Sequence, residues 1–299
     1  TDPLGVLVSE GQDANSYDPE GLLAFGQTYY WRVDEVNGAP DRTIIPGEVW
    51  SFTAEPFSIA IETITATASG SSSADAGPEN TINGSGLDTM DQHSTTGTDM
   101  WLSNAGDQPW IQYEFSRVYK LHEMWVWNSN QLIESFVGLG AKDVSIETSE
   151  DGAAWAVLEG ASEFAQAPGK STYTANTVVD FGAAMAKFVR ITINAAWGML
   201  PQAGLSEVRF FSIPTTAREP QPASGAQLDA ASTVLKWRAG REAVSHDVSL
   251  GTDPDNLALL GTSDQSGFAT GPLDYGTTYF WRVDEVNQAG TPTVYTGDI

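Results

Sequence analysis

The side chains that can carry chemistry in this chain are mainly carboxylates. The 299 residues include 39 Asp and Glu, 14 Lys and Arg, three His and no Cys, for a formal net charge of −25. Without cysteine, the sequence offers no thiol nucleophile and no thiolate metal ligand. An acidic surface attracts cations, Ca²⁺ in particular, and repels the phosphates of nucleic acids and anionic lipids. We therefore expect no nucleic-acid partner, and membrane insertion is disfavoured.

Recognisable catalytic motifs do not occur in the sequence. The patterns G-x-S-x-G and H-E-x-x-H are missing, as is a phosphate-binding glycine loop. The three histidines, His93, His122 and His246, stand in unrelated contexts, and pairs of carboxylates are unavoidable among so many acids. We expect a binding protein rather than an enzyme.

The sequence that must position these side chains contains an internal repeat. Residues 27–37 read QTYYWRVDEVN and residues 277–287 read TTYFWRVDEVN, so nine of eleven positions are identical at a separation of 250. Only the first copy continues into Trp50-Ser51-Phe52-Thr53, and only the second is preceded by the stretch 235–250. A spacing this long predicts a two-domain unit that recurs along a larger protein.

Short strands dominate the expected secondary structure, and helical signals are nearly absent. Runs rich in Val, Ile, Thr and aromatic residues alternate with Gly, Pro, Asn and Asp, which is typical of sandwiches and barrels. The expected strands are 28–33, 48–53, 110–115, 123–128, 144–148, 188–193, 208–213, 246–250 and 278–283. Glu55-Pro56 and a proline-rich connector at 214–222 divide the chain into segments 1–55, 56–214 and 215–299.

A second set of patterned strands lies at residues 234–237, 246–252 and 273–283. On these residues, the outer segments resemble the fibronectin type III family. The resemblance implies a β-sandwich that buries an early tryptophan and a Tyr-x-Trp-x-Val strand, so we expect these tryptophans in a core rather than on a sugar platform. It covers the later strands over 1–55 and all but the last strand over 215–299.

The segment 56–214 contains an ordered series of motifs at 66–69, 78–84, 100–103, 108–115, 144–152, Trp155, 186–191 and 205–210. By this series the segment resembles the discoidin family, also called F5/8 type C or family 32 carbohydrate-binding domains. It implies a jelly-roll β-sandwich with both termini at one end and ligand-binding loops at the other. The full prediction is an all-β protein in which this jelly roll lies between two incomplete fibronectin type III-like β-sandwiches.

The discoidin resemblance also implies a Ca²⁺ site near an early turn and a late Ser-Glu strand. Here the turn is Asn83-Gly84 and the late acid is Glu207. Asn83 in place of the family's Asp removes one charge, which Asp88 can restore, and Ca²⁺ takes about six to eight oxygen ligands. We expect Asn83, Asp88 and Glu207 to bind Ca²⁺ with help from carbonyls. The alternative is that Asn83-Gly84 is only a turn and Glu207 only caps a strand.

Two loops are candidates for a sugar site, because sugar recognition combines an aromatic face with fixed polar groups. Loops 128–140 and 194–204 offer Phe136 and Trp197 for stacking, with Asn130 and His93 for hydrogen bonds. We expect Trp197 to be exposed at the end of the sandwich distal to Glu55 and Pro214. Against this hypothesis, these loops contain no Arg, and their apolar side chains can equally be buried or packed on a neighbouring domain.

The sequence favours a non-catalytic, extracellular or cell-surface carbohydrate-binding and adhesion module of a tandem-repeat bacterial protein. Two alternatives stay open: a structural subunit of an extracellular filament or array, and an accessory region of a glycoside hydrolase. Because both outer segments are incomplete, residues 1–55 of one copy can complete residues 215–299 of the next by strand addition, head to tail. The other explanation is a fragment of a longer array in which neighbouring repeats complete these segments.

Overall fold

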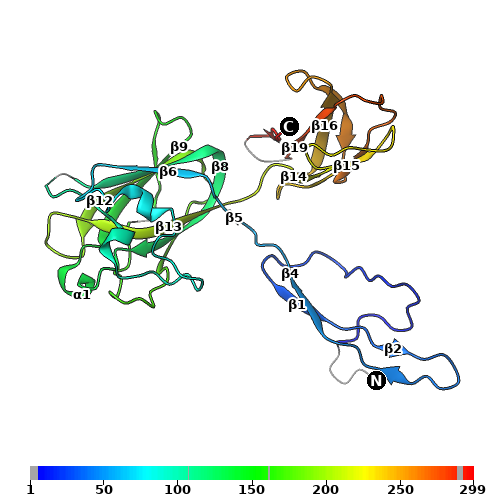
Figure 1. The fold of residues 1–299 in the computed structure, drawn as a ribbon, viewed down its shortest axis with the longest axis horizontal. Coiled ribbons are helices and arrows are strands. Elements are labelled where there is room, and N and C mark those ends of the chain that lie inside the picture. Colours follow the sequence, from blue (N-terminus) through cyan, green and yellow to red (C-terminus); the bar gives the residue numbers. More distant parts are fainter. Residues whose placement is uncertain (1–5, 107, 161, 288–291) are drawn as a thin grey trace. The chain divides into compact units, whose positions relative to one another are not determined.

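A computed structural model describes residues 6–106, 108–160, 162–287 and 292–299 (Figure 1). The chain separates into two compact units, residues 1–57 and residues 58–299. The second unit holds one large β-sandwich and two smaller sheets that follow it. In the described part of the chain, no helix has the length and hydropathy needed to cross a membrane.

The first unit consists of two antiparallel strand pairs. Its elements are β1 (Thr28–Trp31) with β4 (Trp50–Thr53), and β2 (Glu35–Val36) with β3 (Ile44–Ile45). In the β1–β4 pair, Trp31 lies opposite Trp50 and Tyr29 lies opposite Phe52. The ring centroids of these pairs are 4.8 and 5.6 Å apart. Trp31 and Trp50 nevertheless remain 49% exposed, so the expectation that these tryptophans are buried is wrong within this unit.

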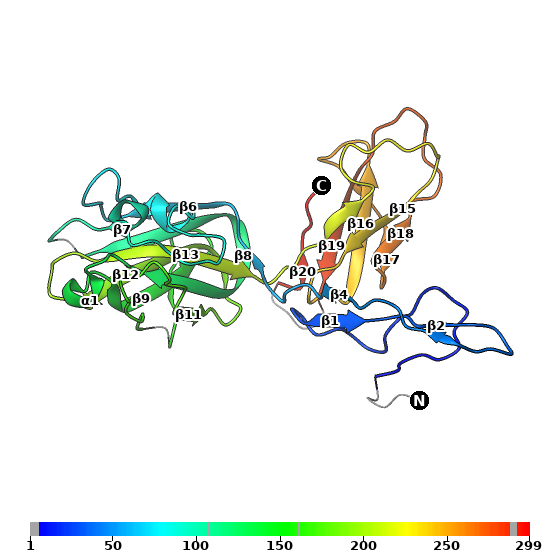
Figure 2. The same cartoon turned by 60° about the horizontal axis from the view of Figure 1, so that its bottom comes forward.

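The β-sandwich of the second unit is built around one very long strand, β8 (Trp110–Asn128). Its first half pairs with β6 and β12, and its second half pairs with β11 and β13, so β8 belongs to both layers (Figures 1 and 2). The other strands are β5 (Ile59–Ala60), β6 (Ile64–Ala68), β7 (Trp101–Leu102), β9 (Ala141–Ser149), β10 (Ala156–Val157), β11 (Thr177–Asp180), β12 (Met185–Ala196) and β13 (Gly204–Ser212). The two strands expected at 110–115 and 123–128 are thus one continuous strand.

Alternation along these strands fills the core of the sandwich. Ile111, Tyr113 and Phe115 of β8 are buried every second residue, and Val189, Ile191 and Ile193 of β12 repeat the pattern from the neighbouring strand. Side chains at a spacing of two lie on one face of a strand, so both strands turn an apolar face inward. The sandwich is entered through β5, which pairs with the last residues of β13, so its first and last strands are neighbours.

Three short helical segments interrupt the strands of the sandwich. They are the 3-10 turns η1 (Pro78–Thr81) and η2 (Gly97–Asp99) and the single α-helical turn α1 (Glu134–Val137). α1 lies at the end of the sandwich opposite β5, as both views show (Figures 1 and 2). A single turn carries no helical periodicity, which is why the sequence pattern does not predict it.

The remaining strands form two small sheets around a second core. One sheet has the order β14 (Arg218–Gln221), β15 (Val234–Arg238), β18 (Gly267–Ala269). The other has the order β17 (Ala258–Ser263), β16 (Ser245–Gly251), β19 (Phe280–Val286), β20 (Val294–Tyr295). Their core consists of the buried side chains Leu235, Trp237, Val248 and Val283, so the expected burial of the early tryptophan is confirmed in this copy.

The two copies of the repeat share their local geometry as well as their sequence. The amide of Gly47 donates to Asp34 at 3.1 Å, and the amide of Gly297 donates to Asp284 at 3.0 Å. Two tyrosine hydroxyls accept from the backbone five residues upstream, Tyr29 from Ala24 and Tyr279 from Asp274. Strand pairing also agrees, since β2 and β3 align as β19 and β20 do at an offset of 250. Residues 24–37 and 42–47 are therefore structural equivalents of residues 274–287 and 292–297.

Candidate functional site

The loops expected to bind ligand are held together at the α1 end of the sandwich. The Gly198 amide donates to the Gly138 carbonyl at 2.7 Å, and the Trp197 amide donates to the Gly140 carbonyl at 3.0 Å. A Cβ atom on Gly198 would lie 1.7 Å from the Val137 carbonyl oxygen, so only glycine fits this crossing. Loops 128–140 and 194–204 therefore behave as one rigid structure.

A buried carboxylate fixes the turn that follows α1. Glu134 is fully buried, and its two carboxylate oxygens accept from the amides of Leu139 and Gly140 at 3.0 and 2.9 Å. Burial raises the pKa of Glu134, whereas these amide donors lower it. Sequence analysis missed this residue, because a single acid in an apolar loop gives no local signal of its long-range role.

Asn130 holds the same loop from inside and is not available to a ligand. Its side chain is completely buried and donates to the carbonyls of His93, Ser94 and Lys170. Its amide oxygen accepts from the Gly169 and Lys170 amides. The expectation that Asn130 bonds a sugar hydroxyl is therefore corrected, because every polar atom of the amide already has an internal partner.

His93 is also an interior residue. Its ring is fully buried against Gly86, where an added Cβ atom would lie 2.2 Å from the imidazole. Nδ1 lies 3.0 Å from the Ser94 carbonyl, and Nε2 has no partner among the described residues. Burial lowers the pKa of His93, so the ring is neutral in the folded protein at neutral pH. Its predicted contact with a sugar is corrected, because the whole ring is buried and no part of it reaches the surface.

The two predicted stacking residues differ sharply in exposure. Phe136, on α1, is 91% exposed. Trp197 is half-buried, its indole Nε1 donates to the Phe164 carbonyl at 3.0 Å, and the Lys142 ammonium lies 5.0 Å from its ring centroid. The ring most available to a ligand is thus Phe136, while Trp197 braces the loop beneath it.

Other apolar side chains of the same two loops are also exposed rather than buried. Met199 is fully exposed, and the other exposed apolar side chains of these two loops are Leu132, Ile133 and Leu200. The backbone that carries these side chains is held by the contacts of Glu134, Asn130 and Gly198. Their exposure therefore does not result from a loosely packed loop. A patch of this kind on a well-packed support indicates an interaction site.

The predicted metal ligands come together only in part. Glu207, on β13, is buried, and one carboxylate oxygen accepts from the Gly84 amide at 3.2 Å. Asn83 caps its own turn through the Ser85 amide at 2.8 Å, and Asp88 accepts from the Met90 and Gln92 amides. The structure thus joins Glu207 to the 83–84 turn, and it shows Asp88 engaged in a neighbouring turn.

The electrostatics of Glu207 are unusual for a carboxylate. Burial raises its pKa to about 8, against the opposing effects of the Gly84 amide and the Arg209 charge. A bound cation would offset the cost of burying the ionised Glu207 carboxylate. The residues present fit a cation held by this one carboxylate and by neutral carbonyl, amide or water oxygens. No group of three His, Cys, Asp or Glu side chains able to hold a metal occurs among the described residues.

Comparison with known families identifies the middle of the chain. Residues 64–204 match the family model of the F5/8 type C domain. The β-sandwich of the second unit is therefore an F5/8 type C domain, and the discoidin resemblance is confirmed for this segment. The fibronectin type III resemblance of the outer segments stays a prediction. A comparison with curated proteins gives no match.

Similar solved structures are sugar-binding modules of low sequence identity. A CBM32 module of a family 31 glycoside hydrolase from Clostridium perfringens is 17% identical, with a TM-score of 0.40 over 52% of this chain and 95% of that chain. A family 32 module from C. perfringens in complex with galactose is 12% identical, with a TM-score of 0.38 over 52% and 99% of the two chains. A CBM32 module from C. perfringens in complex with GalNAc-β-1,3-galactose is 13% identical, with a TM-score of 0.37 over 52% and 100%.

Proposed function

We propose that the F5/8 type C domain binds carbohydrate at its α1 end, as a non-catalytic module of an extracellular or cell-surface protein. The observation that carries this proposal is the exposure of Phe136 on a rigid support. An aromatic ring stacks on the apolar face of a pyranose, and a ring carried on a well-held backbone turn requires little ordering of the loop when it binds.

Polar groups for the hydroxyls of a sugar lie on the same loops or in contact with them. Gln131 is half-buried next to Gly97, with 3.5 Å between its amide carbon and the position of a Gly97 Cβ. Lys170 is exposed on the loop that Asn130 fixes, and Lys142 lies over Trp197. These side chains replace Asn130 and His93 as the expected hydrogen-bonding groups. They also supply the positive charge that the sequence lacks as arginine in these loops.

Exposed apolar side chains at the α1 end, here called the tip, could also act as a membrane anchor. The net charge of −25 opposes approach to an anionic bilayer, because the protein as a whole is repelled by lipid phosphates. A neutral sugar meets no such barrier. We therefore assign the tip to glycan, with Ca²⁺ at Glu207 and the 83–84 turn as a structural support for the loops rather than a contact to the sugar.

Calorimetric titration of the whole chain with galactose and with GalNAc-β-1,3-galactose, backed by a glycan array, tests this function. Phe136→Ala should weaken binding at least about tenfold, since a stacked aromatic contributes about 1–2 kcal/mol or more at a binding hot spot. The matched control is Met199→Ala, which removes an equally exposed side chain that has no ring. Equal losses in both variants, or no glycan bound by the wild-type chain, would reject the proposed site.

A further inference from the structure

The sheet formed by β8, β9 and β12 has a shallow hollow on its outer face. The hollow has a volume of about 380 Å³ and is lined by Gln108, Trp110, Glu147, Arg190 and Thr192. Glu147 lies six residues after Ala141, where β9 begins, and Arg190 lies seven residues before Trp197. Glu147 and Arg190 are thus about 20 Å along the strands from the α1 end, at about 3.3 Å per residue. The hollow is therefore separate from the site proposed around Phe136.

Arg190 is the fixed donor of this hollow. Its neighbours Val189 and Ile191 are buried, so the alternation along β12 turns Arg190 outward. Nε and Nη2 of the guanidinium donate to the side-chain oxygen of Gln112 at 3.1 and 2.7 Å. The guanidinium carbon lies 4.3 Å from the ring centroid of Trp155. A guanidinium has about five N–H bonds, so Arg190 keeps donors for a ligand after its bonds to Gln112 are made.

A tight turn holds Trp155 beside this guanidinium. Asp151 accepts from the amides of residues 153–154 at 2.8 and 2.9 Å. The indole of Trp155 donates to the Gly152 carbonyl at 3.2 Å. Arg190 is therefore in place between a fixed ring and a fixed amide before any ligand arrives. Such preorganisation lowers the cost of ordering side chains on binding.

Glu147 places a carboxylate on the neighbouring strand. It lies directly opposite Arg190 in the pairing of β9 with β12. The Cβ atoms of directly opposed residues are about 4.5–5.5 Å apart, which is close enough for long side chains to meet. Within the part of the chain that the structure describes, the Glu147 carboxylate nevertheless has neither an ion pair nor a hydrogen bond. A charged donor and a charged acceptor thus face one hollow without satisfying each other.

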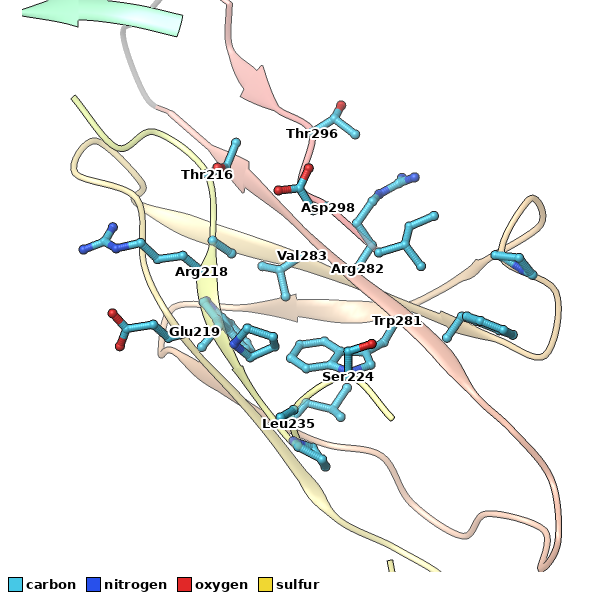
Figure 3. Close-up of a pocket in the computed structure, with 18 of the residues that line it drawn as sticks. Thr216, Arg218, Glu219, Ser224, Leu235, Trp281, Arg282, Val283, Thr296 and Asp298 are labelled. Atoms are coloured by element: carbon cyan, nitrogen blue, oxygen red, sulfur yellow. The ribbon is translucent and has the colours of Figure 1, made fainter. Parts of the chain in front are cut away.

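The groove beside the small sheets differs in this respect. There Trp281 lies with Leu235 and Val283, two buried residues of the second core (Figure 3). The charged residue next to it, Arg282, forms an ion pair with Asp284 at 2.8 Å. That groove combines core side chains with a satisfied ion pair, whereas the hollow at Glu147 offers unmatched polar groups to a polar ligand.

We propose that the hollow is a second carbohydrate site, which binds a neutral sugar through two adjacent hydroxyl groups. A hydroxyl both donates and accepts, so one sugar hydroxyl can accept from Arg190 while its neighbour donates to Glu147. Trp110 borders the same hollow and offers an apolar ring to the C–H groups of the sugar. This inference goes beyond glycan binding at the α1 end and does not depend on it.

The charges at the hollow favour a neutral sugar over an acidic one. Glu147 repels a carboxylate that is placed beside Arg190, and the net charge of −25 repels anions from the chain as a whole. A cationic ligand would meet the same opposition from Arg190. A neutral pair of hydroxyls satisfies both charged groups at once, so neither is desolvated without a partner.

NMR of the tryptophan indoles locates the site. The ¹⁵N-labelled full chain is titrated with galactose, glucose and mannose, three neutral hexoses whose hydroxyls are arranged differently. The indole signal of Trp110, assigned with Trp110→Phe, should shift saturably with at least one hexose, both in the wild type and in Phe136→Ala. A shift confined to Trp197 would place the sugar at the α1 end alone and overturn the second site. Absence of a saturable Trp110 shift with all three hexoses would overturn it as well.

The same titration of charge variants tests the proposed contacts. In the Phe136→Ala background, Glu147→Gln should weaken binding about tenfold or more, because it removes a charged acceptor. Its fold should persist, since Glu147 has no partner among the described residues. Glu114→Gln is the matched control on the same strand face as Gln112, where it pairs with Lys187 rather than with the hollow.

Two outcomes would reject the proposed chemistry. Equal affinity of Glu147→Gln and Glu114→Gln for the hexose would show that Glu147 does not contact the sugar. Tighter binding of galacturonic acid than of galactose, strengthened further by Glu147→Gln, would assign Arg190 to an acidic ligand instead. Neither result bears on binding at the α1 end, which is tested by Phe136→Ala in the wild-type background.

Discussion

Glu207 accepts a hydrogen bond from the backbone amide of Gly84 at 3.2 Å. This contact ties the late strand β13 to the early turn at residues 83–84. It also leaves a buried carboxylate with only partial compensation, since burial raises its pKa to about 8. The stability of the domain should therefore depend on pH and, because the ionised carboxylate is negative, on the concentration of cations.

Without Ca²⁺, we expect the F5/8 type C domain to lose stability as the pH rises. The folded Glu207 keeps its proton up to a pKa of about 8, whereas the unfolded residue titrates at its ordinary value of 4.5. Between these values the folded state binds more protons, so the free energy of unfolding falls with rising pH by up to about 1.4 kcal/mol per unit. Urea unfolding in EGTA should be measured from pH 5 to 8.5. The free energy of unfolding of Glu207→Gln should rise relative to that of the wild type as the pH increases. Parallel curves for the two proteins would refute this role for Glu207.

Calcium should reverse that loss. The ion requires the ionised carboxylate, so it should raise the melting temperature at pH 8.5 more than at pH 5. Glu207→Gln should abolish the shift, and Asp88→Asn or Asn83→Ala should reduce it if these residues are ligands as predicted. Differential scanning fluorimetry with CaCl₂ and with EDTA measures the effect. A calcium shift that Glu207→Gln leaves intact would place the ion elsewhere.

Asn130→Ala should destabilise the domain by about 3 kcal/mol or more. The substitution leaves three buried or part-buried carbonyls and two amides without their shared partner, and each unsatisfied buried group costs about 1–3 kcal/mol unless water replaces it. Asn194→Ala is the control, because Asn194 is exposed and its bonds to Gln108 and Ser145 lie at the surface. Chemical denaturation compares the two variants. A loss for Asn130→Ala no greater than for Asn194→Ala would show that its bonds are replaced by water.

Gly198→Ala should disrupt the α1 end of the sandwich. The new Cβ atom would meet the Val137 carbonyl at 1.7 Å, so the two loops must separate, at a cost of about 2 kcal/mol or more. Gly97→Ala lies at the same end of the domain, and its Cβ would meet the Gln131 side chain at an ordinary distance of 3.5 Å. Hydrogen exchange of residues 134–140 should rise in Gly198→Ala alone. Equal protection in the two variants would argue against the close crossing.

The strands of the F5/8 type C domain were predictable because their information is local. Ile111, Tyr113 and Phe115 alternate with polar neighbours, and a period of two specifies one buried face. The equivalence of Trp31 and Trp281 was also visible, since a repeat needs no knowledge of the fold. The continuity of β8 across residues 116–122 was not predictable. These residues lack the regular alternation of the flanking stretches, so the sequence does not show that 110–115 and 123–128 form one strand.

The interior roles of Asn130, His93 and Glu134 were not predictable. Polar residues in a loop look alike whether they meet a ligand or the backbone of a distant loop. The partners of Asn130 come from residues 93–94 and 169–170, which only the fold brings together. The exposure of Leu132 and Met199 was left open for the converse reason, because apolar residues in a loop are compatible with burial unless their surroundings are known.

The pairing of β5 with the end of β13 governs how the F5/8 type C domain would respond to mechanical tension. Ile59 lies opposite Ser212, so a pull on the chain from both sides acts directly across this pair. In an antiparallel pair the hydrogen bonds run perpendicular to the strands, so the load falls on them one at a time, as in a zipper. Stretching would peel the sandwich open from its joined end, and the surface around Phe136, at the far end, would be the last to deform.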